Sequence, residues 1–231
     1  MSVKAGSKNY MAWIAGSLRK RFGAKVMSRE KDLVSILVKT VLSQNTNDRN
    51  RGRAYANLKR KFPRDKELLA AKTGEIAKAI RVAGLNRQKA VRLKTILRRI
   101  KKERGKLDLS FLCKMSRDNA RRYLLGFKGI GEKTAAVVLL FGCGMPAFPV
   151  DTHILRVSKR LGILPEKTTA DQAHQILGAM VPARLCHELH LNLIALGRII
   201  CHPRKPDCPV CPLNKRCKYY LKLWKKYERA A

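Results

Sequence analysis

Acidic residues are scarce in this sequence. Its 231 residues include 16 Asp and Glu against 51 Lys and Arg, which gives a formal net charge of +35 at pH 7. Such an excess of one sign is far larger than solubility requires in a chain of this size, so we expect a polyanionic partner. Nucleic acid is the first candidate, because a protein that neutralises phosphates gains affinity from the counterions they release.

Long apolar runs are missing as well. No segment approaches the roughly 20 apolar residues that cross a bilayer, and the basic residues are spread along the chain instead of lying on one amphipathic helix. We therefore expect no membrane partner. The apolar segment at residues 10–18 is interrupted by Gly16 and Ser17, so it does not resemble a secretory signal. We expect an intracellular, cytoplasmic protein that associates with the nucleoid.

Strand patterns and linkers are equally rare. Alternation of apolar and polar residues is confined to residues 106–110, which we interpret as an extended connection, and no Gly/Ser-rich or Pro-rich linker divides the chain. Helical spacing begins after Asp32, a candidate cap, and runs through residues 33–41. Further helices are expected at residues 51–61, 66–79, 88–101, 116–125, 132–141, 152–161, 170–181 and 186–199. The pattern predicts an all-α fold.

A glycine-rich turn joins two of these helices. Residues 124–135 read Leu-Leu-Gly-Phe-Lys-Gly-Ile-Gly-Glu-Lys-Thr-Ala, which is the spacing of a helix–hairpin–helix. Glycines allow positive φ and a close approach to another surface, while the N–H groups that start the second helix attract a phosphate. Such a hairpin can grip a DNA backbone without reading its sequence. The simpler interpretation is a tight turn between packed helices. Gly84-Leu85-Asn86 also begins a basic helix, although its similarity to the hairpin turn is too weak to indicate a repeat.

Two ionisable residues stand at helix starts. Lys133 lies in the first turn after the hairpin, where the helix dipole disfavours its ammonium by roughly 0.3–1 kcal/mol. That is too little to make it a nucleophile, so burial under a substrate and nearby cations such as Lys128 would have to supply the rest. Asp151 begins a Val-Asp-Thr-His turn where an N-cap belongs. A capped aspartate stays ionised, and an ionised carboxylate beside an emerging sugar cation is what N-glycosidic cleavage requires.

Together the hairpin, Lys133 and the turn at residues 150–153 resemble the helix–hairpin–helix DNA glycosylase superfamily, and both parts occur at that family's spacing. The resemblance implies that Lys133 attacks C1′ of a damaged nucleotide, expels the base and forms a Schiff base that β-eliminates the 3′ phosphate. It implies that Asp151 stabilises the developing sugar cation and assists proton transfer.

The resemblance extends to the endonuclease III branch of that family and covers nearly the whole chain. Residues 190–201 lead into a cysteine cluster as in that branch, and residues 41–48 resemble its loop, from which an amide enters the gap left by the flipped base. Either Gln44 or Asn45 fits this role. Lys128 replaces the usual proline of the hairpin, and residues 44–47 depart from the commoner Ala-Gln-Ala-Thr type, which leaves the damage preference open. The DNA contacts we expect are Gln44, Asn45, Lys128, Gly129, Ile130, Gly131, Thr134, His153 and Arg156.

Four of the seven cysteines crowd together near the C-terminus, in the spacing Cys-x₆-Cys-x₂-Cys-x₅-Cys: Cys201, Cys208, Cys211 and Cys217. Four thiolates in so short a loop indicate a metal. Their chemistry alone favours Zn²⁺, whereas the resemblance implies the [4Fe–4S] cluster of endonuclease III-like enzymes. The others stand apart and are expected to be small buried residues, without a disulfide framework: Cys113, Cys143 and Cys186.

The architecture implied by the resemblance has two helical lobes with a DNA-binding cleft between them. Residues 30–143 would form a central, barrel-like helical domain with the hairpin, and residues 1–29 plus 144–231 an iron–sulfur cluster domain built from both termini. We expect a monomer that binds duplex DNA containing a damaged base or abasic site.

The leading functional hypothesis is a bifunctional DNA glycosylase and abasic-site lyase acting on oxidised pyrimidines. One alternative is a mismatch glycosylase that removes thymine or uracil. Adenine removal is disfavoured, because adenine-removing relatives carry an added carboxylate before the wedge loop and no Asp or Glu occurs between Leu33 and Asn47. The other alternative is a non-catalytic DNA-binding module in which the hairpin and a zinc ion hold the duplex.

Overall fold

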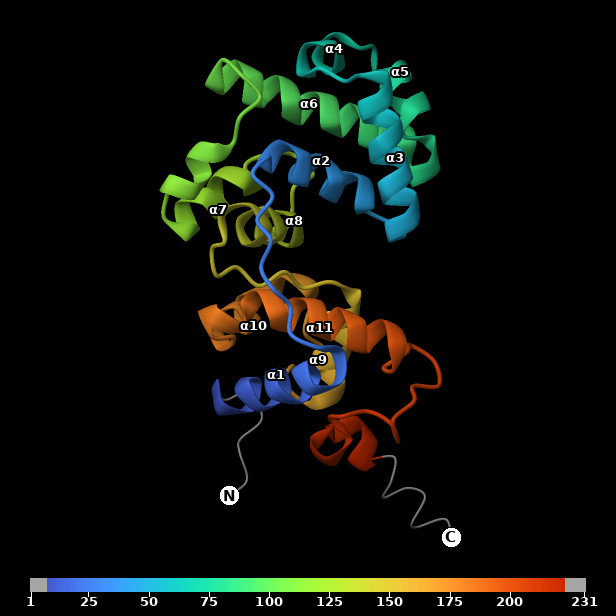
Figure 1. Cartoon of the computed structure of the whole chain (residues 1–231), viewed down its shortest axis with the longest axis vertical. Helices are drawn as coiled ribbons and strands as arrows, with labels where there is room; N and C mark the ends of the chain where they lie inside the picture. The colour runs from blue at the N-terminus through green and yellow to red at the C-terminus, as the bar shows by residue number, and fades with distance from the viewer. Residues whose placement is uncertain (1–7, 223–231) are drawn as a thin grey trace. The chain divides into compact units, whose positions relative to one another are not determined.

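The computed structural model describes residues 8–222, in which helices joined by turns and irregular segments make up the secondary structure and no β-strand occurs. The chain divides into two compact units. Within the described residues, unit 1 combines residues 8–28 with residues 145–222, and unit 2 is residues 29–144. The colours of Figure 1 show α1, from the N-terminal part of the sequence, in the same unit as α9, α10 and α11. The all-α prediction is confirmed. No helix in the described part of the chain is long and apolar enough to cross a membrane.

Unit 2 is built around helix α2 (Leu33–Ser43), nine of whose eleven residues are buried. Asp32 caps this helix as predicted, since its side chain accepts a hydrogen bond of 2.9 Å from the backbone N–H of Ser35. Helix α2 packs against α3, α6 and α8. The other elements of the unit are α3 (Asp48–Lys61), α4 (Asp65–Ala70), α5 (Thr73–Ala79), η1 (Arg81–Ala83), α6 (Asn86–Arg104), η2 (Ser110–Lys114), α7 (Arg117–Leu125), α8 (Glu132–Val138) and the π-helical turn η3 (Leu139–Cys143).

The single helix predicted at residues 66–79 is wrong, because the structure breaks it into α4 and α5. Ala71 adopts an extended conformation between them, and its carbonyl accepts a hydrogen bond from Lys94 of α6. The backbone N–H of Lys72 donates to the Glu75 carboxylate at 2.8 Å, which starts α5. Helical spacing continues through the break, so periodicity alone did not reveal it.

A disulfide joins Cys113 of η2 to Cys143 of η3, with their Cα atoms 4.9 Å apart. This corrects the expectation that both are buried thiols. Cys186, by contrast, is buried as expected, and its Sγ lies 3.7 Å from the Pro182 carbonyl oxygen. The two partners are 30 residues apart in sequence, and only the packing of η2 on η3 brings them together. Closing a loop of that size stabilises a folded domain by roughly 3–4 kcal/mol in the chain-entropy description.

Unit 1 is organised by helix α11 (Cys186–Ile199), which packs against α1 (Lys8–Phe22) and α9 (Thr152–Leu161). A two-pronged ion pair joins α1 to α11, because Arg19 donates to both carboxylate oxygens of Glu188 at 2.7 and 2.6 Å. Gly197 allows α9 and α11 to approach closely, since a Cβ there would lie 2.7 Å from that of His153. The remaining elements are α10 (Ala170–Met180), η4 (Ala183–Leu185) and η5 (Asn214–Arg216).

Candidate functional site

The glycine hairpin connects α7 to α8 in unit 2. Phe127 and Ile130 are buried, and the backbone N–H of Ile130 donates to the Phe127 carbonyl at 3.0 Å. Gly129 has a φ of 90°, which favours glycine, and Gly131 is extended at the N-cap of α8. Lys128 and Gly129 are exposed. The hairpin is therefore anchored by its two apolar side chains and presents Lys128 and backbone groups to solvent.

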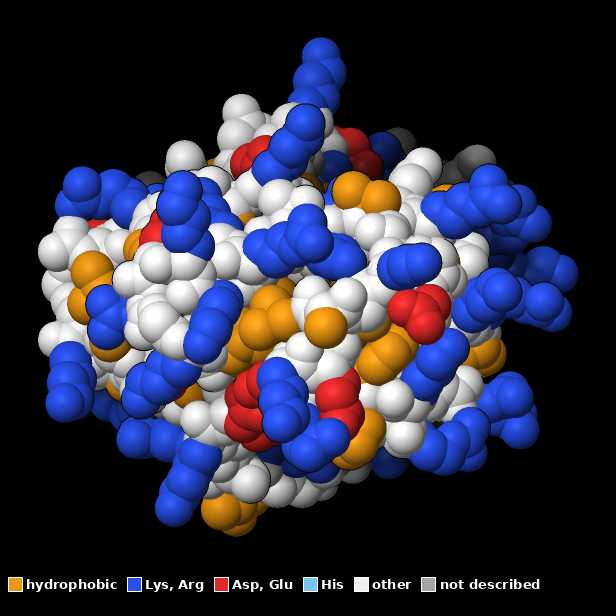
Figure 2. Space-filling view, turned by 90° about the horizontal axis from the view of Figure 1, so that it is seen from above, with side chains coloured by type: hydrophobic (Ala, Val, Ile, Leu, Met, Phe, Trp, Pro, Cys, Tyr) orange, Lys and Arg blue, Asp and Glu red, His pale blue; other side chains and the backbone are white. Residues whose placement is uncertain are grey.

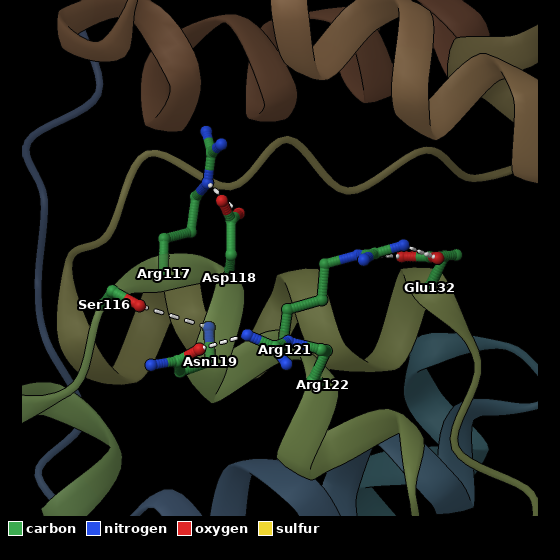
Figure 3. A network of polar contacts seen from close by, with 7 residues as sticks. All are labelled: Ser116, Arg117, Asp118, Asn119, Arg121, Arg122 and Glu132. Carbon is green, nitrogen blue, oxygen red and sulfur yellow. Dashed lines mark hydrogen bonds and ion pairs between the residues drawn. The ribbon is translucent and has the colours of Figure 1, made fainter.

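An ion pair ties the two helices of the hairpin together (Figure 3). Arg121 on α7 donates from Nε to the Glu132 carboxylate at 2.8 Å and from Nη2 to its other oxygen. The hydrogen bond with Glu132 raises the pKa of Arg121. Because Glu132 is the first residue of α8, its negative charge interacts favourably with the helix dipole. Arg121 balances that charge at the place where an approaching phosphate would otherwise be repelled.

Lys133 is the second residue of α8 and is exposed to solvent. The next residue, Thr134, is only 4% exposed, so its side chain lies within the packing of unit 2. The structure therefore presents the lysine at the surface beside the hairpin, while the DNA contact expected of Thr134 falls on a residue whose side chain is enclosed.

Asp151 caps helix α9 in unit 1. Its Oδ1 accepts a hydrogen bond of 2.8 Å from the backbone N–H of Ile154, as the sequence indicates, and its Oδ2 has no hydrogen-bond partner in the described part of the chain. The preceding turn is fixed by burial of Phe148 and Val150 and by His190, whose Nδ1 lies 3.0 Å from the Pro149 carbonyl oxygen. Oδ2 of Asp151 can therefore accept a further hydrogen bond or interact with a positive charge, and the backbone that carries it is held in place by its neighbours.

His153 and Arg156 make contacts inside unit 1. Arg156 donates from Nη2 to the Gly197 carbonyl at 2.7 Å and from Nε to the Cys201 carbonyl at 3.0 Å. The same Nη2 lies 3.1 Å from Nδ1 of His153. These side chains join α9 to the end of α11 and to the first cysteine of the cluster. Their predicted contacts with DNA stay predictions.

The four clustered cysteines line one cavity, together with Arg160, Ile200, Pro206, Asn214, Tyr219 and Tyr220. Arg160 donates a hydrogen bond of 3.2 Å to Sγ of Cys201. Burial raises the pKa of the Cys211 thiol to about 11 and also raises the pKa values of Cys208 and Cys217. No group of three or more His, Cys, Asp or Glu side chains in the described residues stands in the geometry of a preformed metal site.

The amide loop lies next to the hairpin within unit 2. Gln44 ends α2, and its Nε2 lies 3.4 Å from the Gly129 carbonyl oxygen. Asn45 is exposed and has a φ of 51°. In the sequence, Leu85 stood out only as part of a turn that begins a basic helix. Leu85 has a φ of 46° and is 49% exposed at the start of α6. An apolar residue directly after a glycine at a helix start was the signal that could have identified it.

Positive charge is distributed widely over the surface. Figure 2 shows one face of the molecule, on which Lys and Arg side chains are scattered across the whole view and only a few acidic side chains appear. This face agrees with the net charge of +35, which produces a field that attracts a polyanion.

Comparison with known proteins decides the family. Residues 38–183 match the HhH-GPD superfamily of base excision DNA repair proteins. The chain belongs to this family. An Arabidopsis thaliana protein, At3g47830, whose name assigns it as a DNA glycosylase, is 38% identical over 77% of this chain. Endonuclease III of Thermotoga maritima is 33% identical over 92% of this chain. The chain spans 61% of the length of the Arabidopsis protein and 94% of the Thermotoga protein.

Solved structures give the same answer for this HhH-GPD protein. An endonuclease III in a non-covalent complex with DNA superposes with a TM-score of 0.80 at 27% identity, covering 95% of this chain and 99% of that one. A thermostable thymine-DNA glycosylase superposes with a TM-score of 0.77 at 26% identity, covering 94% of this chain and 97% of that one. The predicted membership of an endonuclease III-like branch is confirmed.

Proposed function

We propose that this protein is a bifunctional DNA glycosylase and abasic-site lyase that removes oxidised pyrimidines from duplex DNA. The observation that carries the proposal is Lys133, an exposed amine placed in the first helical turn after a hairpin that presents backbone groups to solvent. An amine in that position can reach a nucleotide whose backbone the hairpin holds. The family to which the chain belongs and its likeness to endonuclease III support the same conclusion.

In this mechanism the Nζ of Lys133 attacks C1′ of the flipped nucleotide as the bond from C1′ to the base breaks. The sugar ring then opens to a Schiff base, and loss of a C2′ proton expels the 3′ phosphate. The free lysine is exposed, so its activation must come from the bound substrate. Burial beneath the nucleotide disfavours the ammonium and releases the neutral amine that acts as nucleophile.

Asp151 contributes charge to the same step. Its Oδ1 is committed to the cap of α9, which leaves Oδ2 to stabilise the positive charge that develops on the sugar as the base departs. The cap holds the carboxylate in place. Lys133 belongs to unit 2 and Asp151 to unit 1.

Extraction of the nucleotide costs a few kcal/mol in lost stacking and pairing, and less when the base is damaged. We propose that Gln44 fills the gap left in the duplex, because this amide, unlike that of Asn45, is hydrogen-bonded to the hairpin. We also assign the exposed Leu85 as an apolar wedge that enters the duplex. An apolar side chain placed between bases replaces part of the stacking that flipping removes.

We also propose that Cys201, Cys208, Cys211 and Cys217 hold a [4Fe–4S] cluster. The donor set fits, since four cysteines line one cavity whose other members include a guanidinium directed at a sulfur. A bound cluster would replace the thiol protons and fix a basic loop against DNA. Anaerobically purified protein should be brown and contain about four iron atoms per chain. Colourless protein with a single zinc ion would show instead that the site is a Cys₄ zinc site.

A second candidate is a glycosylase that removes thymine or uracil from mismatches, which the likeness to a thermostable thymine-DNA glycosylase favours. A panel of otherwise identical duplexes separates the two. One duplex carries an oxidised pyrimidine, others carry a thymine or uracil mismatch or an abasic site, and an undamaged duplex is the control. We expect base release and strand cleavage with the oxidised pyrimidine, and cleavage at the abasic site. Base release from the mismatches alone would favour the second candidate.

A further inference from the structure

The side chain of Gln44 is held by two other segments of unit 2. Its Oε1 accepts a hydrogen bond from Nη1 of Arg92 on α6, and its Nε2 faces the carbonyl oxygen of Gly129 in the hairpin. The amide therefore connects the end of α2, the beginning of α6 and the hairpin. The contact with Arg92 is the stronger of the two, because its donor is charged and the contact with Gly129 is long at 3.4 Å.

These two partners allow only one orientation of the amide. A guanidinium can only donate and a backbone carbonyl can only accept, so rotating the amide by half a turn would oppose two donors at one end and two acceptors at the other. With both contacts made, Gln44 retains one N–H and one oxygen lone pair at fixed positions. Those two groups are what it can offer to a base.

Arg92 is itself held in place by the hairpin. A Cβ at residue 129 would lie 2.6 Å from Cδ and 2.9 Å from Cζ of Arg92, so its side chain crosses Gly129 at a distance that only glycine allows. One turn earlier on α6, the buried Lys89 donates to the Leu42 carbonyl at 2.9 Å and to the Ala83 carbonyl at 2.8 Å. Helix α6 thus fixes the backbone of the loop as well as its amide.

We propose that Arg92 is a positioning residue that determines specificity: by fixing the orientation of the Gln44 amide, it sets which base is accepted opposite the extracted nucleotide. This rests on the proposed function, in which Gln44 enters the gap in the duplex. A fixed pair of donor and acceptor favours the base whose edge is complementary to it and leaves an unmatched polar group against the others. A freely rotating amide would match several bases about equally.

Binding to duplexes with a tetrahydrofuran abasic analogue opposite A, C, G or T tests the proposal without requiring catalysis. We expect the wild-type protein to bind the four duplexes with different dissociation constants. Arg92→Met should reduce the ratio between the best and worst of them by about tenfold. Arg92→Lys, which keeps the charge but loses the guanidinium fork, should restore part of the ratio. Gln44→Ala should remove the preference, and adding Arg92→Met to it should have no further effect on the ratio.

The matched control is Arg98→Met, which removes an exposed arginine from the same helix. It should weaken binding to all four duplexes by one common factor, through the lost phosphate attraction alone. Thermal unfolding of each variant shows that the fold is retained. Equal binding of the four duplexes by the wild-type protein, or a common factor for Arg92→Met, would overturn the role of Arg92. If no lesion is processed by the wild-type protein, the proposed function fails independently, since these ratios are measured without turnover.

Discussion

Replacing Lys133 with alanine should abolish the covalent adduct that borohydride forms between this protein and damaged duplex DNA. The reductant traps the Schiff base, and alanine has no amine with which to form one. Strand cleavage should fall to the level seen without enzyme. Lys133 is exposed on the surface of unit 2, so its loss leaves the core intact and the variant should fold normally. Denaturing gels of trapped reactions measure the adduct directly.

Lys128→Ala is the matched control for this experiment, since it removes another exposed lysine from the same hairpin. This variant should bind DNA more weakly, with a shallower salt dependence, yet still form the adduct when DNA is saturating. Lys133→Arg adds a second comparison, because it keeps the charge but its guanidinium stays protonated and cannot form the imine. An adduct that persists in Lys133→Ala would assign the chemistry to a different amine.

Much of the fold was predictable because its signals depend on residues that are close in sequence. Helical spacing located most helices, and Asp32 and Asp151 each begin a helix with the capping hydrogen bond that their side chains suggest. The hairpin could be predicted in the same way, because the φ of 90° at Gly129 is a local conformational requirement that glycine meets. Local signals of this kind depend on a few adjacent residues and need no knowledge of tertiary packing.

Contacts between distant segments account for what the sequence did not reveal. The break at Ala71 is fixed partly by Lys94 on another helix, and Cys113 meets Cys143 only because η2 packs on η3. The site shows the same limit. The sequence left Gln44 and Asn45 equivalent, and the difference between them is the contact that Gln44 makes with a hairpin 85 residues away.

Arg156 shows that the sequence gives the position of a cation on a helix but not the groups that its side chain contacts. The sequence placed this cation in the first turns of α9 beside Asp151, and a cation there suggests a phosphate contact. Its guanidinium donates to the carbonyl oxygens of Gly197 and Cys201, and its expected contact with DNA stays a prediction. A strongly basic chain offers many cations for each structural role, so charge alone cannot distinguish those that face DNA from those that join helices.

The change Asp151→Asn should slow base release by about 10²–10³-fold without weakening DNA binding. Asparagine caps helices about as well as aspartate, so the hydrogen bond from Ile154 and the start of α9 should survive. What is lost is the negative charge that Oδ2 would offer to the sugar cation. Removing that charge should also strengthen DNA binding slightly, because one repulsive group disappears from a surface that attracts phosphates.

This substitution separates an enzyme from a DNA-binding module more sharply than a truncation would. Single-turnover base release and the dissociation constant for the same damaged duplex are measured side by side. Asp32→Asn is the matched control, since Asp32 caps α2 through the same kind of hydrogen bond and belongs to the other unit. It should leave base release unchanged. If Asp151→Asn released bases as fast as the wild-type protein, this carboxylate would serve the cap alone, and the charge stabilising the sugar would have to come from another group.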